Sequence, residues 1–303
     1  MTIRVTLAAL LIAILAFVVT DTSHASAYND AVLADNPLLY WTFDEAGDKD
    51  NAKSLVNDMP SNELRAINGA GRAPSTSVGG VSLGRAASFD GIGVSRFFAD
   101  NLFSPGTGPG EDFIATQQWA VEFWFKAERD GAQYLSETFA AGSNDPGIIY
   151  GFNGAASPTP ELELFHGART GAGPVSVGEW HHVVLAFHGN NSGFKDNLRE
   201  IYVDGVLTAD TTSAFSAGHG LNAIGIGNST LGANPFLGLI DEYAIYELGD
   251  ITDLAERQAK VAAIAAHGDH LIPEPSSLLL AVLGFIGLGG CGRRRMAYVS
   301  FGK

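Results

Sequence analysis

Short apolar runs recur along the chain, and stretches rich in Gly, Pro, Asn, Asp and Ser separate them. Runs of this length with turn-forming residues at both ends are typical of β-strands. No repeat of solenoid or propeller length is evident. The pattern predicts an all-β fold with strands at 38–43, 86–89, 119–126, 134–140, 148–152, 161–165, 180–188, 199–203, 221–227 and 236–246.

Residues 119–126 show the clearest alternation. Large apolar side chains occupy every second position, beginning with Trp119, and the opposite face carries Ala120, Glu122, Trp124 and Lys126. Further along, Asp204-Gly205 separates two apolar runs. Because Asp-Gly readily adopts the positive φ of a type I′ turn, this dipeptide predicts a tight hairpin.

One helix is expected near the C-terminal end of this region. Asp253 can cap it, with Glu256 three residues later as the reciprocal partner. Leu254, Val261 and Ile264 would then share its buried face. The Gly-, Ser- and Asn-rich stretches at 44–85 and 101–117 predict long surface loops.

Residues 1–27 have the order of a secretory signal peptide. Arg4 precedes an apolar stretch from Val5 to Val19, and Ala25-Ser26-Ala27 supplies a small-x-small cleavage site. Signal peptidase would therefore leave Tyr28 as the first residue. An uncleaved membrane anchor is the alternative, but the apolar stretch is short for a full span.

The C-terminal end carries a second targeting pattern. Pro273-Glu274-Pro275 precedes an apolar segment at 276–292, and Arg293-Arg294-Arg295 follows it. The prolines keep the motif extended, the segment can barely cross a bilayer, and the arginines hold its end on the cytoplasmic side. The alternative is a plain membrane anchor.

This tail resembles the PEP-CTERM sorting domain of Gram-negative bacteria. The resemblance implies processing by an exosortase, transient membrane anchoring, and delivery to the cell surface or extracellular matrix. Such proteins usually belong to bacteria that make extracellular polysaccharide. Family members usually stop soon after the arginines, whereas this chain continues from Met296 to Lys303.

The middle of the chain is strongly acidic. The whole chain has a formal charge of −15, and removing residues 1–27 and 273–303 takes away five basic and two acidic residues, which leaves −18. Such a domain repels nucleic acid and suits divalent cations or neutral sugars, although solubility alone would also explain the charge. The single cysteine, Cys291, lies in the tail, so no disulfide can stabilise the middle.

Six motifs of the middle resemble LamG-like jelly-roll domains and follow the order of that family. They are Leu39-Tyr40-Trp41-Thr42-Phe43-Asp44-Glu45, Ser88-Phe89-Asp90-Gly91, Val121-Glu122-Phe123-Trp124-Phe125-Lys126, Trp180-His181-His182-Val183-Val184, Tyr202-Val203-Asp204-Gly205 and 236–246. The resemblance implies a concanavalin A-like jelly-roll sandwich of two antiparallel sheets at 28–264. A linker at 265–272 would join it to the sorting signal at 273–303.

Calcium is the cofactor that the resemblance implies, since many LamG-like domains bind it near one rim. Asp90, Asp241 and the weaker candidate Glu242 lie in the matching motifs, and calcium takes oxygen ligands. The alternative is structural: Asp90 would close an Asx turn and Asp241 would bond to the backbone. His181 and His182 would face opposite sides of a strand, which disfavours a zinc site.

Candidate binding and catalytic residues are few. Trp124 is the tryptophan most suited to stacking on a sugar, although core packing is the default for a strand tryptophan. Glu161 and Glu163 share one strand face, but His166 stands where glucanases carry their last acid, so a solvated rim is the better interpretation. We therefore expect a non-catalytic module that binds carbohydrate or another surface partner. A glycan-active hydrolase or lyase, or a purely structural matrix component, is the alternative.

Overall fold

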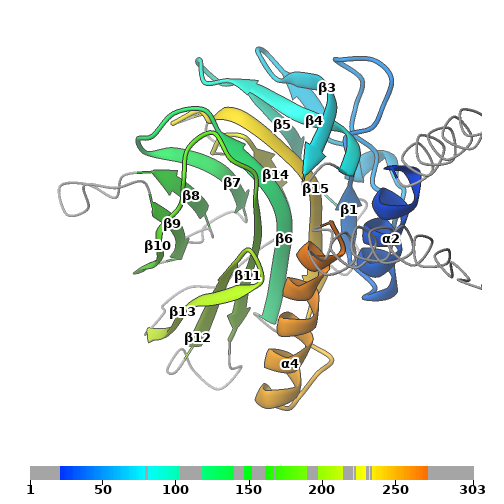
Figure 1. Ribbon diagram of the computed structural model, residues 1–303. Coiled ribbons are helices and arrows are strands. Elements are labelled where there is room, and N and C mark those ends of the chain that lie inside the picture. Colours follow the sequence, from blue (N-terminus) through cyan, green and yellow to red (C-terminus); the bar gives the residue numbers. More distant parts are fainter. Residues whose placement is uncertain are drawn as a thin grey trace, which may run out of the picture.

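The computed structural model describes two stacked β-sheets with helices on one outer side (Figure 1). The described residues are 21–78, 81–100, 102, 118–139, 147–151, 161–166, 168–189, 197–213, 221, 223–229, 232 and 234–271. Residues 1–20 of the expected signal peptide, the expected transmembrane segment at 276–292, and the sorting residues Pro273, Glu274, Pro275 and Arg293 to Arg295 lie outside them. Within the described part, no helix is both long and apolar enough to cross a membrane.

The eight-stranded sheet has the order β13-β12-β11-β6-β15-β4-β3, and β1 pairs with β15 off this path. Its strands are β1 (Leu39–Trp41), β3 (Gly71–Val78), β4 (Val81–Asp90), β6 (Gln118–Ala127), β11 (His181–His188), β12 (Asn197–Val203), β13 (Val206–Ser213) and β15 (Leu237–Glu247). All pairings are antiparallel. The central strand β6 is buried on both faces except at Lys126.

The seven-stranded sheet has the order β10-β9-β8-β7-β14-β5-β2. Its strands are β2 (Arg65–Ile67), β5 (Arg96–Asp100), β7 (Gln133–Phe139), β8 (Gly147–Gly151), β9 (Glu161–His166), β10 (Ala168–Pro174) and β14 (Ala223–Ile226). These pairings are also antiparallel. The expected all-β sandwich of two antiparallel sheets is therefore confirmed.

The main apolar core fills the space between the sheets. It takes Trp119, Phe123 and Ile245 from one sheet and Phe97 and Leu135 from the other. The expected alternation of 119–126 is confirmed, because its large apolar residues face this core while Ala120 and Trp124 belong to a second cluster. Several strands that the sequence predicts, including the Asp204-Gly205 hairpin with φ of 51° and 75°, are present.

A second apolar cluster lies on the other side of the eight-stranded sheet. Helices α2 (Asp21–Ala34) and α4 (Leu254–Ala265) and the 3₁₀ helix η3 (Ala266–Leu271) cover this face (Figure 1). Asp253 caps α4, since its side chain accepts a hydrogen bond from the Glu256 amide at 3.0 Å. Val261 and Ile264 are buried as expected, but Leu254 is 42% exposed and does not share their face.

Apart from β13, which the Asp204-Gly205 hairpin predicts, four strands were not expected from the sequence: β2, β3, β5 and β10. Three of them, β2, β3 and β10, lie at sheet edges, where Gly and Pro are tolerated because one side of the backbone needs no partner. The stretch 44–85 is consequently not one long loop, since it also holds the 3₁₀ helix η1 (Pro60–Asn62). The expected linker at 265–272 is also different: η3 packs against α2, and His267 within it is buried.

Candidate functional site

The outer face of the seven-stranded sheet is the candidate binding surface. Phe97 and Ala99 of β5 point into the main core, so Arg96 and Phe98 point to the outside. In the ladder, Phe98 lies opposite Arg65 on β2 and opposite Gly225 on β14. Because residues opposite one another share a face, these side chains form a row across neighbouring strands.

Glu137 extends this row, because it lies opposite Gly225 on β7. Gly225 leaves no room for a side chain: an added Cβ would lie 2.9 Å from the Asn228 carbonyl oxygen. The turn at 227–229 therefore folds closely over β14 beside the row. The backbone of this turn lies over Gly225, between Phe98 and Glu137 on the outer face.

Arg96 is held in place on this surface. Its guanidinium carbon lies 4.4 Å from the centre of the Phe98 ring, and its Nη1 donates to the Ser229 carbonyl oxygen at 2.8 Å. Burial lowers the pKa of Arg96, and the charge of Glu137 opposes that effect. Arg65, more exposed, pairs with Asp100 at 2.7 Å.

This arrangement has the chemistry of a sugar-binding surface. The Arg96 guanidinium covers one face of the half-buried Phe98 ring, so the C–H side of a sugar ring would have to meet the opposite face or the edge of that ring. Guanidinium and carboxylate groups pair with sugar hydroxyls. Sequence patterns missed it because β5 was not expected as a strand. The aromatic pair Phe97-Phe98 is the signal that could have indicated a strand here, because aromatic residues favour strands.

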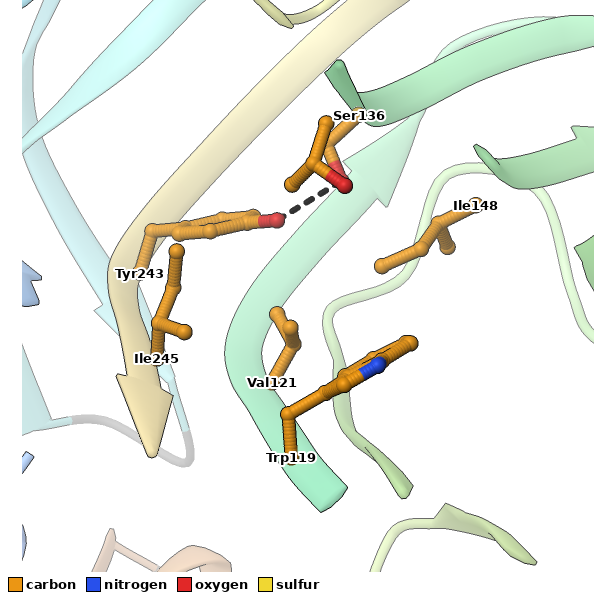
Figure 2. Close-up of a pocket in the computed structure, with 7 residues that line it drawn as sticks. Trp119, Val121, Ser136, Ile148, Tyr243 and Ile245 are labelled. Atoms are coloured by element: carbon orange, nitrogen blue, oxygen red, sulfur yellow. Dashed lines mark hydrogen bonds between the residues drawn. The ribbon is translucent and has the colours of Figure 1, made fainter. Parts of the chain in front are cut away.

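The cavity between the sheets is too small for a sugar. It has a volume of about 10 Å³ and is lined by Trp119, Val121, Ser136, Thr138, Ile148, Tyr243 and Ile245 (Figure 2). Within it, the hydroxyl oxygens of Ser136 and Tyr243 lie 2.7 Å apart. This volume suits about one water molecule, so the cavity is a packing feature of the core.

The other outer face, under the helices, holds a buried polar group that the sequence did not predict. Glu122 accepts hydrogen bonds from the hydroxyls of Tyr28 at 3.0 Å and Tyr246 at 2.5 Å. His182 Nε2 lies 2.9 Å and His267 Nδ1 3.0 Å from Glu122 Oε1. We call these five residues the Glu122 cluster.

Glu122 is ionised within this cluster. Burial acts to raise the pKa of Glu122, but the hydrogen bonds and charges of His182 and His267 outweigh it and lower the pKa to about 2. For His267, burial acts to lower the pKa, and Glu122 and Asp35 together raise it. Burial also raises the pKa of Tyr28 and Tyr246, so both hydroxyls keep their protons and act as donors.

Trp124 is not placed to bind a sugar. Its side chain is 2% exposed and packs against His182, with ring centres 4.9 Å apart, and against Tyr28 at 6.3 Å. The prediction that Trp124 stacks on a ligand is therefore wrong for the folded domain. Helix α2 and η3 cover the sheet face on which Trp124 lies.

The structure does not bring the proposed calcium ligands together. Asp90 lies opposite Leu237, four residues before Asp241 on β15, so about 13 Å of strand separates them. Ligands of one calcium ion each lie about 2.5 Å from it. Asp90 Oδ1 instead accepts from the Ile92 amide at 3.0 Å, and Asp241 Oδ1 accepts from the Glu242 amide at 3.0 Å.

Glu242 is fully buried at a β-bulge and adopts a φ of 53°. Burial raises its pKa well above the usual range, and the Tyr40 hydroxyl is hydrogen-bonded to it. A neutral carboxyl is a poor calcium ligand. Among the described residues, no group of three or more His, Cys, Asp or Glu side chains could hold a metal ion.

The acidic pair on β9 is also not a solvated rim. Glu163 is 1% exposed, and Glu161 accepts from the Gly173 amide at 3.2 Å. The other histidines are structural: His181 pairs with Asp204 and His188 with Glu200, at 2.8 and 2.9 Å.

Comparison with solved structures agrees with this architecture. Domain 4 of AbnA, a GH43 extracellular arabinanase from Geobacillus stearothermophilus in complex with arabinotriose, superposes with a TM-score of 0.50 at 16% identity. The match covers 76% of this chain and 98% of that domain. A Trypanosoma rangeli sialidase superposes with a TM-score of 0.49 at 12% identity, covering 76% of this chain and 32% of the sialidase. At 16% identity, the likeness to the arabinanase domain shows the fold alone.

Sequence comparisons identify both parts of the chain. The model of the concanavalin A-like lectin/glucanases superfamily matches residues 106–248, and that of the PEP-CTERM protein-sorting motif matches residues 271–295. A search of curated proteins finds no match. The sorting motif implies export, sorting to the cell surface or extracellular space, and processing by an exosortase. Residues 106–248 therefore belong to the concanavalin A-like lectin/glucanases superfamily, in a chain that also carries a PEP-CTERM sorting motif.

Proposed function

We propose that this chain is an exosortase-processed surface or matrix protein of a Gram-negative bacterium whose sandwich binds carbohydrate without cleaving it. The observation that carries the proposal is the row of Arg65, Phe98 and Glu137 on the outer face of the seven-stranded sheet, with Arg96 stacked on Phe98. This surface combines an apolar ring with fixed donors and acceptors.

The ligand class follows from the same surface and from the charge of the domain. The acidic middle of the chain disfavours a polyanion, so a neutral polysaccharide fits best. A shallow surface with one aromatic ring gives weak binding, with a Kd between about 1 mM and 1 μM, or about −4 to −8 kcal/mol. Arabino-oligosaccharides are the first probes, because the arabinanase domain of similar fold was solved with arabinotriose.

A glycan array and titration calorimetry with the mature protein test this proposal. Phe98→Ala should weaken binding about tenfold, since it removes the stacking ring. Val206→Ala is the matched control, because Val206 is an exposed apolar residue (63%) in the β12–β13 hairpin, on the other sheet. Equal binding by Phe98→Ala and the wild type would refute the site. The absence of binding to any glycan would favour the structural matrix role.

The same protein preparation tests the absence of catalysis. Glycoside hydrolysis needs two carboxyl groups across the scissile bond. Glu161 and Glu163 are the acidic pair to examine, since they lie two residues apart on β9. We expect no new reducing ends during long incubation with polysaccharide. Sugar release that disappears in Glu161→Gln or Glu163→Gln would establish a hydrolase instead.

Exosortase processing is tested on the tail. In a host that encodes an exosortase, mass spectrometry of the mature protein should find it without Arg293 to Lys303. Replacing Pro273 and Pro275 with Ala should leave the tail attached, because the extended motif is lost. An intact tail on the wild-type protein would make it a plain membrane anchor.

Calcium binding stays a prediction and has a direct test. An ion that binds only the folded state raises the melting temperature. Asp90 and Asp241 lie too far apart to share one ion. If one of them holds calcium with other ligands, calcium should stabilise the mature protein, and the substitution of that residue alone, Asp90→Ala or Asp241→Ala, should remove the gain. Identical melting curves with calcium and with a chelator would mean that both carboxylates are structural.

A further inference from the structure

Both ends of the described domain meet on one face of the eight-stranded sheet. Helix α2, from the N-terminal side, packs against η3, from the C-terminal side (Figure 1). Asp35, just after α2, accepts from His267 Nε2 at 3.0 Å and pairs with Lys260 of α4 at 2.5 Å. The N-terminal and C-terminal segments of the described domain therefore contact one another as well as the sheet.

The Glu122 cluster is the centre of this attachment. Tyr28 reaches it from the N-terminal side, His267 from the C-terminal side, and His182 and Tyr246 from the sheet. Tyr28 is fully buried, and its ring makes edge contacts with those of Trp124, His182 and His267 at 6.2–6.3 Å between centres. Removing the Glu122 carboxylate would take the acceptor from Tyr28, Tyr246 and His182 together, and these groups are buried.

The bond between Ala27 and Tyr28, at which we expect the signal peptide to be cut, lies inside this structure. Helix α2 runs from Asp21 to Ala34, so the bond is in helical conformation with the side chain of Tyr28 buried beneath it. A protease must accommodate an exposed segment of several residues around the bond that it cuts. The docked helix does not offer such a segment.

We propose that docking of the N-terminal segment on the Glu122 cluster makes the Ala27–Tyr28 bond inaccessible to signal peptidase. Cleavage must then come before docking, or the segment must detach first. In the cleavage itself, water adds across the amide, which leaves a carboxylate on Ala27 and an amine on Tyr28. After it, Tyr28 and Asp35 secure His267. Residue Leu271, two positions before the sorting motif in the sequence, ends the 3₁₀ helix η3 that packs against α2. This inference rests on the proposed export signal.

The test compares cleavage rates of the folded full-length chain in detergent micelles by purified bacterial signal peptidase. A synthetic peptide of residues 1–40, which lacks the sheet, serves as the undocked reference. We expect the folded wild type to be cut at least tenfold more slowly than the peptide. His267→Ala and Asp35→Asn weaken the polar contact between the segment and η3, and each should raise the cleavage rate towards that of the peptide.

His188→Gln is the matched control. His188 is buried on β11 and pairs with Glu200, away from the cluster, so its loss perturbs the domain without releasing α2. It should leave the slow rate unchanged. Asp35→Asn changes no side-chain volume and keeps the test valid if His267→Ala does not fold.

The outcomes distinguish a wrong export signal from an accessible cleavage site in the folded chain. A peptide that is not cut at Ala27–Tyr28 would refute the proposed export signal. A peptide that is cut, together with a folded wild-type chain that is cut as fast, would refute the closure alone. A His188→Gln chain that is cut as fast as His267→Ala would also refute it, since general destabilisation would then explain the rates.

Discussion

Replacing Glu122 with Gln should strongly destabilise the domain. The carboxylate accepts bonds from four donors in an environment with no solvent access. The difference between the usual glutamate pKa of 4.5 and the value of about 2 corresponds to about 3 kcal/mol. Gln keeps the volume but loses the charge, and its NH₂ group faces donors that need an acceptor. Loss of one partner from a buried ion pair costs about 3–5 kcal/mol, which agrees with the value of about 3 kcal/mol that the pKa difference gives.

Urea unfolding of the mature protein at pH 7, followed by tryptophan fluorescence, measures this loss. The midpoint should fall while the slope with urea stays constant, because the surface exposed on unfolding is unchanged. Glu179→Gln is the control: Glu179 is exposed, so its change should stay within about 0.5 kcal/mol. A loss below about 1 kcal/mol for Glu122→Gln would refute the idea that the cluster holds an ionised carboxylate.

The remaining predictions concern pH and one glycine. Folding lowers the pKa of Glu122, so this carboxylate stabilises the domain above about pH 4.5, and the stabilisation is lost as the pH falls towards 2. Folding raises the pKa of His267, so this imidazole stabilises the domain fully below about pH 6.5, and the stabilisation is lost as the pH rises through the raised pKa. Urea midpoints across this range should therefore peak between these limits, and a steady rise to alkaline pH would contradict the assignment. Gly227→Ala should destabilise by about 2 kcal/mol or more, since φ is 83° and the new Cβ would lie 2.1 Å from the Phe89 ring. Gly93→Ala, with φ of 59° and nothing within 4 Å, should lose only about 1 kcal/mol, and an equal loss in both would refute the clash.

Much of the fold could be predicted because strand signals are local. The alternation at 119–126 needs only neighbouring residues to indicate two faces, and Asp204-Gly205 needs only its own dihedral preferences to predict a hairpin. Strands such as β3 and β10 were missed for the same reason. Their Gly and Pro residues are locally typical of loops, and only the edge position in a sheet makes them acceptable.

The candidate sites were harder to predict, because alternation gives two faces and does not say what covers each. The partners of Glu122 are 60 to 145 residues away in the sequence, so no local pattern could pair them. Trp124 lies on the same strand face as Glu122 and Lys126, and these polar neighbours made that face look exposed to a ligand.

The sequence by itself determined the PEP-CTERM sorting motif, the all-β class and the inward side of β6, since each depends on composition or period along a short stretch. The signal peptide at 1–27 stays a prediction. The tertiary structure decided what the outward sides do. On the eight-stranded sheet, two chain ends meet and bury a carboxylate, because that charge is tolerable only with four donors gathered from distant segments. On the seven-stranded sheet, strand register alone brought Arg65, Phe98 and Glu137 into one row.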